Sequence, residues 1–79
     1  MTDEALTSLR REWTPERIAS LRGRLRMGQA PFALAVGYSH ASRVSELEAG
    51  TREVSPSVAL LLEYLDCYGP LDLSHEAQG

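Results

Sequence analysis

Apolar residues recur every three or four positions along most of the chain, with polar residues between them. Ile18, Leu21 and Leu25 share one side of such a segment, and Val44 and Leu47 share one side of another. This spacing predicts α-helices, because positions three and four apart lie on one helical face. No segment shows the strict alternation of a half-buried strand, and no repeat occurs. The pattern predicts an all-α fold, a compact bundle of four to five short helices.

Residues that cap or break helices set the bounds of these elements. Thr14-Pro15 and Ser55-Pro56 each join a capping hydroxyl to a proline, which is a start signal, and Gly50 is a stop signal. Ser39 or His40 caps the segment that Gly50 ends. The helices are expected over residues 3–12, 15–27, 29–36, 41–49 and 57–68. We expect a single domain over 1–79, with its core in 15–68, an extra N-terminal helix in 1–13 and a loose tail in 70–79.

The last expected helix has more apolar positions than a small core needs. One stripe faces the core, and it consists of Val58, Leu61, Leu62 and Leu65. A second group widens that stripe and, with one residue beyond the helix, is the expected dimer surface: Leu60, Tyr64, Tyr68 and Leu71. The alternative dimer surface lies near the N-terminus and consists of Leu6, Leu9 and Trp13. Cys67, in the same last helix, is expected to be a small buried hydrophobe.

Length and composition favour a binding module. A chain of 79 residues has little room for a catalytic cleft. No apolar run reaches the roughly 20 residues that cross a bilayer, so no membrane partner is expected. The acidic start MTDEALTSL is not a secretory signal, and the single cysteine suits a reducing cytoplasm. No histidine, cysteine or serine has the neighbours that metal binding or catalysis requires, so we expect no enzyme, cofactor, metal or small-molecule substrate.

Charge is distributed unevenly along the chain. The net charge is −3, yet all eight basic residues are arginines and lie between Arg10 and Arg52, a window that holds only four acids. A basic stretch of this kind indicates a face that binds nucleic acid. The alternative interpretation is that the arginines are spread over solvated helix surfaces.

The helix expected over 41–49 has an outer face that supports no core. If Val44 points inward, Leu47 and Glu48 lie near it. The outward positions are then almost entirely polar: Ser42, Arg43, Ser45, Glu46 and Ala49. This helix and the short one before it are joined by a turn that begins at Gly37, which indicates a central helix-turn-helix.

Several residues make that indication more specific. Gln29 opens the helix before the turn, Ala33 lies within it, Gly37 begins the turn, and the stretch VSELEAG follows from Val44 to Gly50. In these residues the chain resembles the lambda-repressor/Cro-like group of DNA-binding domains, the XRE family, over residues 15–68. The turn GYSHAS is one residue longer than the family's commonest version, which leaves the register of the following helix open by one residue. Pro31 also departs from the family, which usually has a polar or charged residue there.

The resemblance implies roles for individual residues on double-stranded DNA. The helix over 41–49 would enter the major groove, with Ala41, Ser42, Arg43 and Glu46 at base edges. Arg43 suits a guanine edge or a phosphate, and Glu46 can accept from a cytosine amino group while repelling phosphates. The residues expected at phosphates are Gln29, Ser39, His40, Ser45 and Arg52. For His40 a capping role and simple exposure remain alternatives.

Arg22 and Glu48 have a different expected role. The family pairs an arginine seven residues before the glutamine with the acid of its E-x-G ending, and these two residues stand at those positions. The resemblance implies a structural salt bridge between the helices over 15–27 and 41–49, without DNA contact.

A single module of this size covers only about 600–1,000 Å² of DNA, so we expect a homodimer on a palindromic operator. The resemblance implies a small transcriptional repressor, an autoregulator from a phage or mobile element or an antitoxin-like regulator, in the cytoplasm of a prokaryotic cell or a phage-infected host. The competing hypothesis is a protein-interaction module of the same fold that binds a protein partner such as a toxin. The negative net charge and Glu46 favour that alternative.

Overall fold

A computed structural model describes residues 2–70 of the chain. They form five helices: α1 (Asp3–Glu12), α2 (Pro15–Arg24), α3 (Gln29–Ala35), α4 (Ala41–Ala49) and α5 (Pro56–Tyr68). No strand occurs in this range, so the expected all-α bundle is confirmed. The expected tail and Leu71 lie outside the described residues.

The starts and ends of the helices follow local chemistry. Thr2, Thr14 and Ser55 each accept a hydrogen bond from a backbone N–H in the first turn of α1, α2 and α5. The second helix is shorter than expected, because the backbone of Arg26 has a left-handed φ of 57° that ends α2 before Met27. Such a conformation is uncommon for a residue with a side chain.

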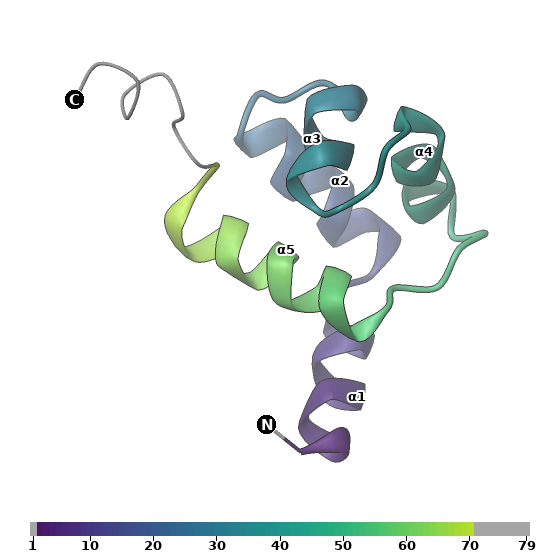
Figure 1. Cartoon of the computed structure of the whole chain (residues 1–79), viewed down its shortest axis with the longest axis vertical. Coiled ribbons are helices and arrows are strands. Elements are labelled where there is room, and N and C mark those ends of the chain that lie inside the picture. Colours follow the sequence, from purple (N-terminus) through teal and green to yellow (C-terminus); the bar gives the residue numbers. More distant parts are fainter. Residues whose placement is uncertain (1, 71–79) are drawn as a thin grey trace.

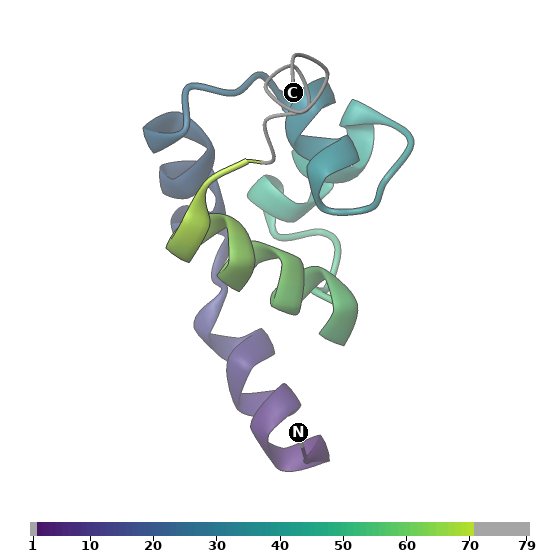
Figure 2. The ribbon, with the colours of Figure 1, turned by 60° about the vertical axis from the view of Figure 1, so that its left-hand side comes forward.

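The helices are arranged around α4 and α5. Both α2 and α3 pack on α4, while α1 packs on α5. Figures 1 and 2 show α1 projecting from one end of the molecule, with α5 crossing between α1 and the group formed by α2, α3 and α4. The α4 helix therefore lies toward the opposite end of the molecule from the start of α1 (Figure 1).

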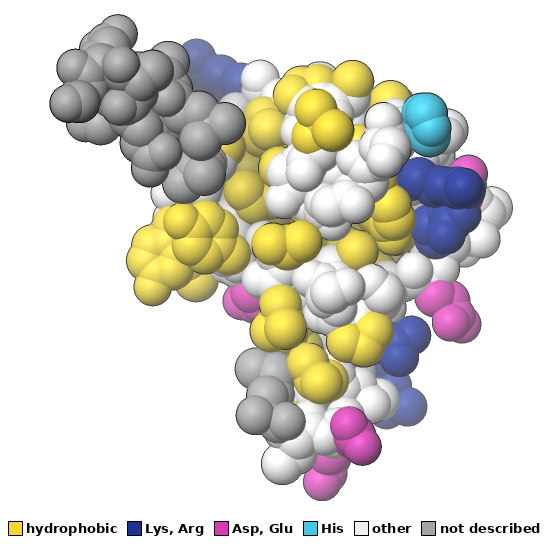
Figure 3. Space-filling view, in the orientation of Figure 1, with side chains coloured by type: hydrophobic (Ala, Val, Ile, Leu, Met, Phe, Trp, Pro, Cys, Tyr) yellow, Lys and Arg dark blue, Asp and Glu magenta, His cyan; other side chains and the backbone are white. Residues whose placement is uncertain are grey.

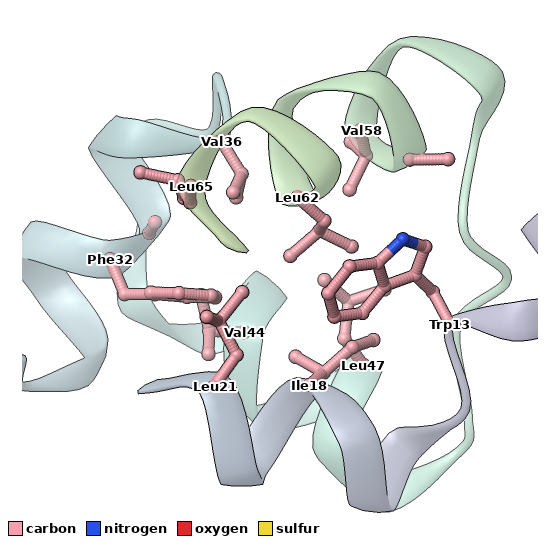
Figure 4. Packing of buried hydrophobic residues seen from close by; sticks show 12 residues of the cluster. Trp13, Ile18, Leu21, Phe32, Val36, Val44, Leu47, Val58, Leu62 and Leu65 are labelled. Carbon is pink, nitrogen blue, oxygen red and sulfur yellow. The ribbon is translucent and has the colours of Figure 1, made fainter. Parts of the chain in front are cut away.

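One hydrophobic core joins the helices (Figure 4), and α1 contributes to it only the partly buried Leu9. Its buried members are Trp13, Ile18, Leu21, Phe32, Ala33, Val36, Val44, Leu47, Val58, Ala59, Leu62 and Leu65. Two expectations about the core were wrong. Leu61 is exposed and Ala59 is buried in its place, because the face of α5 that contains Ala59 lies against the core. Cys67 is exposed, since it lies on the outer side of α5.

Trp13 is the point where α1, α2 and α5 meet. Its indole Nε1–H donates to Glu63 at 3.0 Å, and the Arg17 guanidinium lies 3.7 Å from the ring centroid. Arg17 also pairs with Asp66 at 3.2 Å, and Arg24 pairs with the same carboxylate. Hydrogen bonds from Arg24, and then from Arg17, hold the pKa of Asp66 below its ordinary value. These contacts fasten α1 and α2 to α5.

A bidentate salt bridge joins α2 to α4. Arg22 Nε lies 2.6 Å from Glu48 Oε2, and Arg22 Nη2 lies 3.0 Å from Oε1. The remaining Nη1 donates to the carbonyl of Met27 at 3.1 Å, beyond the end of α2. The side chains are only 25% and 14% exposed, and hydrogen bonding to Glu48 raises the pKa of Arg22. Since α4 has only nine residues, this pair and the apolar contacts of Val44 and Leu47 fix its position.

We expect Glu48→Ala to lower the free energy of unfolding by about 3 kcal/mol, because it leaves the Arg22 guanidinium half-buried without its carboxylate. For a domain of this size that corresponds to a fall in Tm of more than about 10 °C. Thermal unfolding followed by circular dichroism measures the change. Glu53→Ala is the control, because the Glu53 side chain is 95% exposed, and it should change stability by less than about 0.5 kcal/mol. Equal melting of the two variants would contradict the structural role of Glu48.

Candidate nucleic-acid interface

The α3–turn–α4 unit holds one face of α4 inside and leaves the other outside. Val44 and Leu47 are buried against the core, whereas Ser42, Ser45 and Ala49 are exposed. The turn over residues 36–40 depends on Gly37, whose φ of 91° favours glycine, and Tyr38 donates its N–H back to Ala33 at 2.8 Å. The outer face of α4 is consequently a short, polar and sterically open ridge.

Gln29 and Ser45 meet across the two helices. Ser45 Oγ donates to Gln29 Oε1 at 2.8 Å, which joins the first residue of α3 to the middle of α4. Oriented in this way, the Gln29 amide group still has its two N–H donors for an anionic partner. The structure thus brings together two of the residues that the sequence assigns to phosphate contacts.

Glu46, on the same ridge, contacts two arginines, Arg43 of α4 and Arg52 of the segment that follows it. Arg52 Nε donates to Glu46 Oε1 at 2.8 Å, and Arg43 Nη1 lies 3.5 Å from both carboxylate oxygens. The hydrogen bond from Arg52 is the main cause that holds the pKa of Glu46 below its ordinary value of 4.5, with a smaller effect of Arg43. At neutral pH the ridge therefore has two guanidinium groups oriented by one carboxylate.

The backbone after α4 keeps Arg52 close to that helix. Gly50, at a φ of 80°, ends α4 in the left-handed conformation that favours glycine, and Thr51 donates its N–H to the carbonyl of Glu46 at 3.0 Å. The chain consequently turns back beside the last turn of α4. This local geometry explains how a residue beyond the helix reaches Glu46.

The other predicted contact residues lie at the start of α4. Ser39 and His40 are exposed, and Ala41 is half-buried. His40 occupies the capping position of α4, but its side chain makes no capping hydrogen bond, so the sequence signal located the start of the helix and not the interaction.

Folding changes the interpretation of the arginine-rich window. Glu63 and Asp66 of α5 pair with Arg17 and Arg24, and Glu48 pairs with Arg22, so these three arginines are occupied by carboxylates. The pair of Arg22 and Glu48 was expected from the resemblance. The pairs of Arg17 and Arg24 were missed, because the two acids of α5 lie far along the chain. The sequence interpretation also gave no role to Arg10 and Arg11, which close α1.

A separate apolar surface lies over α3 and α5 (Figure 3). Leu60, Tyr64 and Tyr68, three residues of the expected dimer surface, are exposed, and the two tyrosine rings lie 5.1 Å apart. Leu34 of α3 and Leu61 of α5 extend this surface. The alternative dimer surface near the N-terminus is not available as expected, because Trp13 is only 2% exposed and belongs to the core.

Two kinds of feature are absent from residues 2–70. No cluster of three or more histidine, cysteine or acidic side chains is arranged to hold a metal ion in that range. None of the described helices is long and apolar enough to cross a membrane. A comparison of the chain with protein-family models, with curated proteins and with solved structures found no match.

A titration of Glu46 tests the carboxylate geometry. Because the pKa of Glu46 is depressed by Arg52, we expect its midpoint to lie below 4.5 in the parent chain and to rise in Arg52→Gln. The stabilisation from this contact is present above pH 4.5 and disappears as the pH falls through the depressed pKa. NMR detection of the side-chain carboxyl carbon measures the midpoint. Arg11→Gln, which removes an arginine that does not contact Glu46, is the control and should leave the midpoint unchanged. An unchanged midpoint in Arg52→Gln would contradict the geometry.

Proposed function

We propose that the protein is a sequence-specific DNA-binding regulator that inserts α4 into the major groove. The observation that carries the proposal is the division of α4 into an inner face fixed to the core and an outer ridge of polar side chains that includes Arg43, with Arg52 beside it. A major groove about 12 Å wide admits an α-helix, and short side chains allow the helix to approach the base edges. The sequence resemblance to the lambda-repressor/Cro-like family supports the same docking.

The side chains of the ridge suit distinct roles in this complex. Arg43 can bond to the two acceptors of a guanine, Ser42 can bond to any base, and the methyl group of Ala41 can contact a thymine methyl. Glu46 can accept from a cytosine amino group, and it also aligns Arg43 and Arg52 before DNA arrives. Since its carboxylate repels phosphates, Glu46 weakens binding to unrelated sequences.

The residues around the ridge suit the DNA backbone. Gln29, Ser39, His40, Ser45 and Arg52 are the proposed phosphate contacts, which fix the register of α4 without reading sequence. The Ser45–Gln29 hydrogen bond supports this assignment, because it orients the amide donors of Gln29.

We further propose that two copies associate through the apolar surface of α5 and that this dimer binds a palindromic operator. One copy covers too little DNA for tight specific binding, whereas a two-fold dimer doubles the contact. The exposed Leu60, Tyr64 and Tyr68 favour this surface. Bound at a promoter, such a dimer would act as a repressor by excluding other proteins from the operator.

The same apolar surface favours a second candidate function. Leu34 and Tyr68 are 69% and 76% exposed, and large apolar patches often mark protein-binding sites. A protein-interaction module of this fold would use that surface for an unrelated partner. Its complexes would be insensitive to DNA and would depend only weakly on salt.

Selection of bound sequences from random DNA tests the DNA-binding proposal. We expect a palindromic motif with two half-sites about one helical turn apart. Arg43→Ala should weaken binding by about 1–3 kcal/mol, or about 5-fold to 150-fold, for each half-site, because it removes one base contact from each copy. Arg26→Ala removes an equal charge beyond the end of α2 and should retain the site preference. Failure to enrich any motif at low salt would refute the proposal and favour the protein-interaction module.

Sedimentation equilibrium tests the dimer. Tyr64→Asp should weaken self-association at least tenfold, because it places a charge within the apolar surface. Ser20→Asp adds the same charge to an exposed position of α2, outside the apolar surface, and should leave the dimer intact. Equal behaviour of the two variants would exclude the α5 surface as the dimer interface.

A further inference from the structure

The last turn of α1 is fastened to the segment that follows α4. Arg10 Nε donates to the carbonyl of Val54 at 2.5 Å, and Arg10 Nη2 lies 3.7 Å from the Glu53 carboxylate. Because Arg52 lies two residues before Val54, these contacts hold the basic end of α1 beside the basic end of the α4 ridge. The N-terminal helix is thus part of the same surface and not an independent appendage.

A groove of about 490 Å³ lies between these elements. Its walls include Arg10 and Arg11 of α1, Arg52 of the segment after α4, and Thr14 at the start of α2. Its floor is formed by buried core residues such as Ile18 and Leu47. Three arginines from two distant segments of the chain therefore line one groove, together with a single acidic residue, Glu53.

Arginine side chains gather at two levels of this edge. Figure 3 shows dark-blue side chains along one edge, at the level of α4 and again at the level of α1, with acidic side chains between and below them. Arg17, Arg22 and Arg24 are paired with carboxylates elsewhere. Arg11 makes no ion pair with any residue in the described range 2–70, and the pair between Arg10 and Glu53 is long and solvent-exposed, so it holds Arg10 weakly. Arg52 is paired with Glu46 at 2.8 Å, a carboxylate that it shares with Arg43, so this group also has an excess of positive charge.

The helix macrodipole explains only part of this arrangement. Asp3 and Glu4 at the start of α1 and Arg10 and Arg11 at its end complement the dipole. The dipole favours cations near the end of α1. It does not account for the groove or for an arginine contributed from beyond α4. The alignment with α4 requires a separate explanation.

We propose that this groove is a second contact surface for double-stranded DNA, where Arg10, Arg11 and Arg52 bind backbone phosphates that flank the segment read by α4. The inference rests on the proposed function and extends its footprint. Arg10 and Arg11 lie on α1, outside the α3–turn–α4 unit, so they are placed to reach phosphates beyond the base pairs under α4.

The salt dependence of DNA binding tests the inference. Each phosphate contact steepens the slope of log K against log salt by about 0.9. Measured by fluorescence anisotropy between about 50 and 200 mM salt on the selected duplex, Arg11→Gln should have a slope shallower by about 1.8 for the dimer, because one phosphate per copy is no longer neutralised, and its base preference should be unchanged. Arg26→Gln is the matched control and should retain the slope of the parent. Arg11 is chosen because Arg10 also supports the backbone at Val54.

Shortening the duplex gives a second and independent measurement. A duplex trimmed to the base pairs read by α4 lacks the flanking phosphates, so the slope of the parent chain should be shallower on it than on the long duplex. Trimming should reduce the slope of Arg11→Gln by a smaller amount, because that variant already lacks one of the flanking charges.

The outcomes separate the two proposals. If the parent chain binds the selected duplex but Arg11→Gln has the parental slope, the groove does not contact DNA and the inference is overturned, while the role of α4 stands. An equally shallow slope in Arg26→Gln would likewise overturn it, because the effect would then be one of total charge. If the parent chain selects no sequence, the proposed function fails first, and the inference fails with it.

Discussion

The structure depends on the attachment of a nine-residue helix by one face only. A helix this short is unstable alone, since few of its backbone hydrogen bonds close within the segment. Val44 and Leu47 supply the apolar part of the attachment, and the Arg22–Glu48 pair supplies a directional part. Because the inner face makes this attachment, the outer face of α4 takes no part in the core and can be polar.

Ion pairing then decides which arginines remain for a partner. Arg17 and Arg24 are held by Glu63 and Asp66 of α5, and these pairs also position α5 against α2. Near α4 and the end of α1, Arg43 and Arg52 share the single carboxylate of Glu46, Arg10 pairs weakly with Glu53, and Arg11 has no carboxylate partner among residues 2–70, so positive charge is in excess there. An acidic protein can in this way have a basic edge, so its net charge says little about what that edge binds.

The sequence predicted the helical elements well because their ends depend on local chemistry. Hydroxyl caps before Pro15 and Pro56, and the left-handed glycine at position 50, act within a few residues. The end of α2 was misplaced, since nothing local distinguishes Arg26 as a residue with positive φ. The expected burial of Leu61 and Cys67 was also wrong. More positions of α5 are apolar than one face can hold, and only the packing of the helix against the core decides which face is buried. The candidate site was predictable as a set of positions on α4, but the contact from Arg52 to Glu46 and the groove beside α1 arise from segments that only the fold brings together.

The burial of Trp13 has a practical consequence. It is the sole tryptophan of the chain, and its indole is enclosed by the core where three helices join, with its N–H bonded to a carboxylate and a guanidinium against the ring. Indole emission shifts to longer wavelength when the ring enters water, so the native protein contains one intrinsic optical probe at this junction. Its fluorescence reports the detachment of the N-terminal helix without any label.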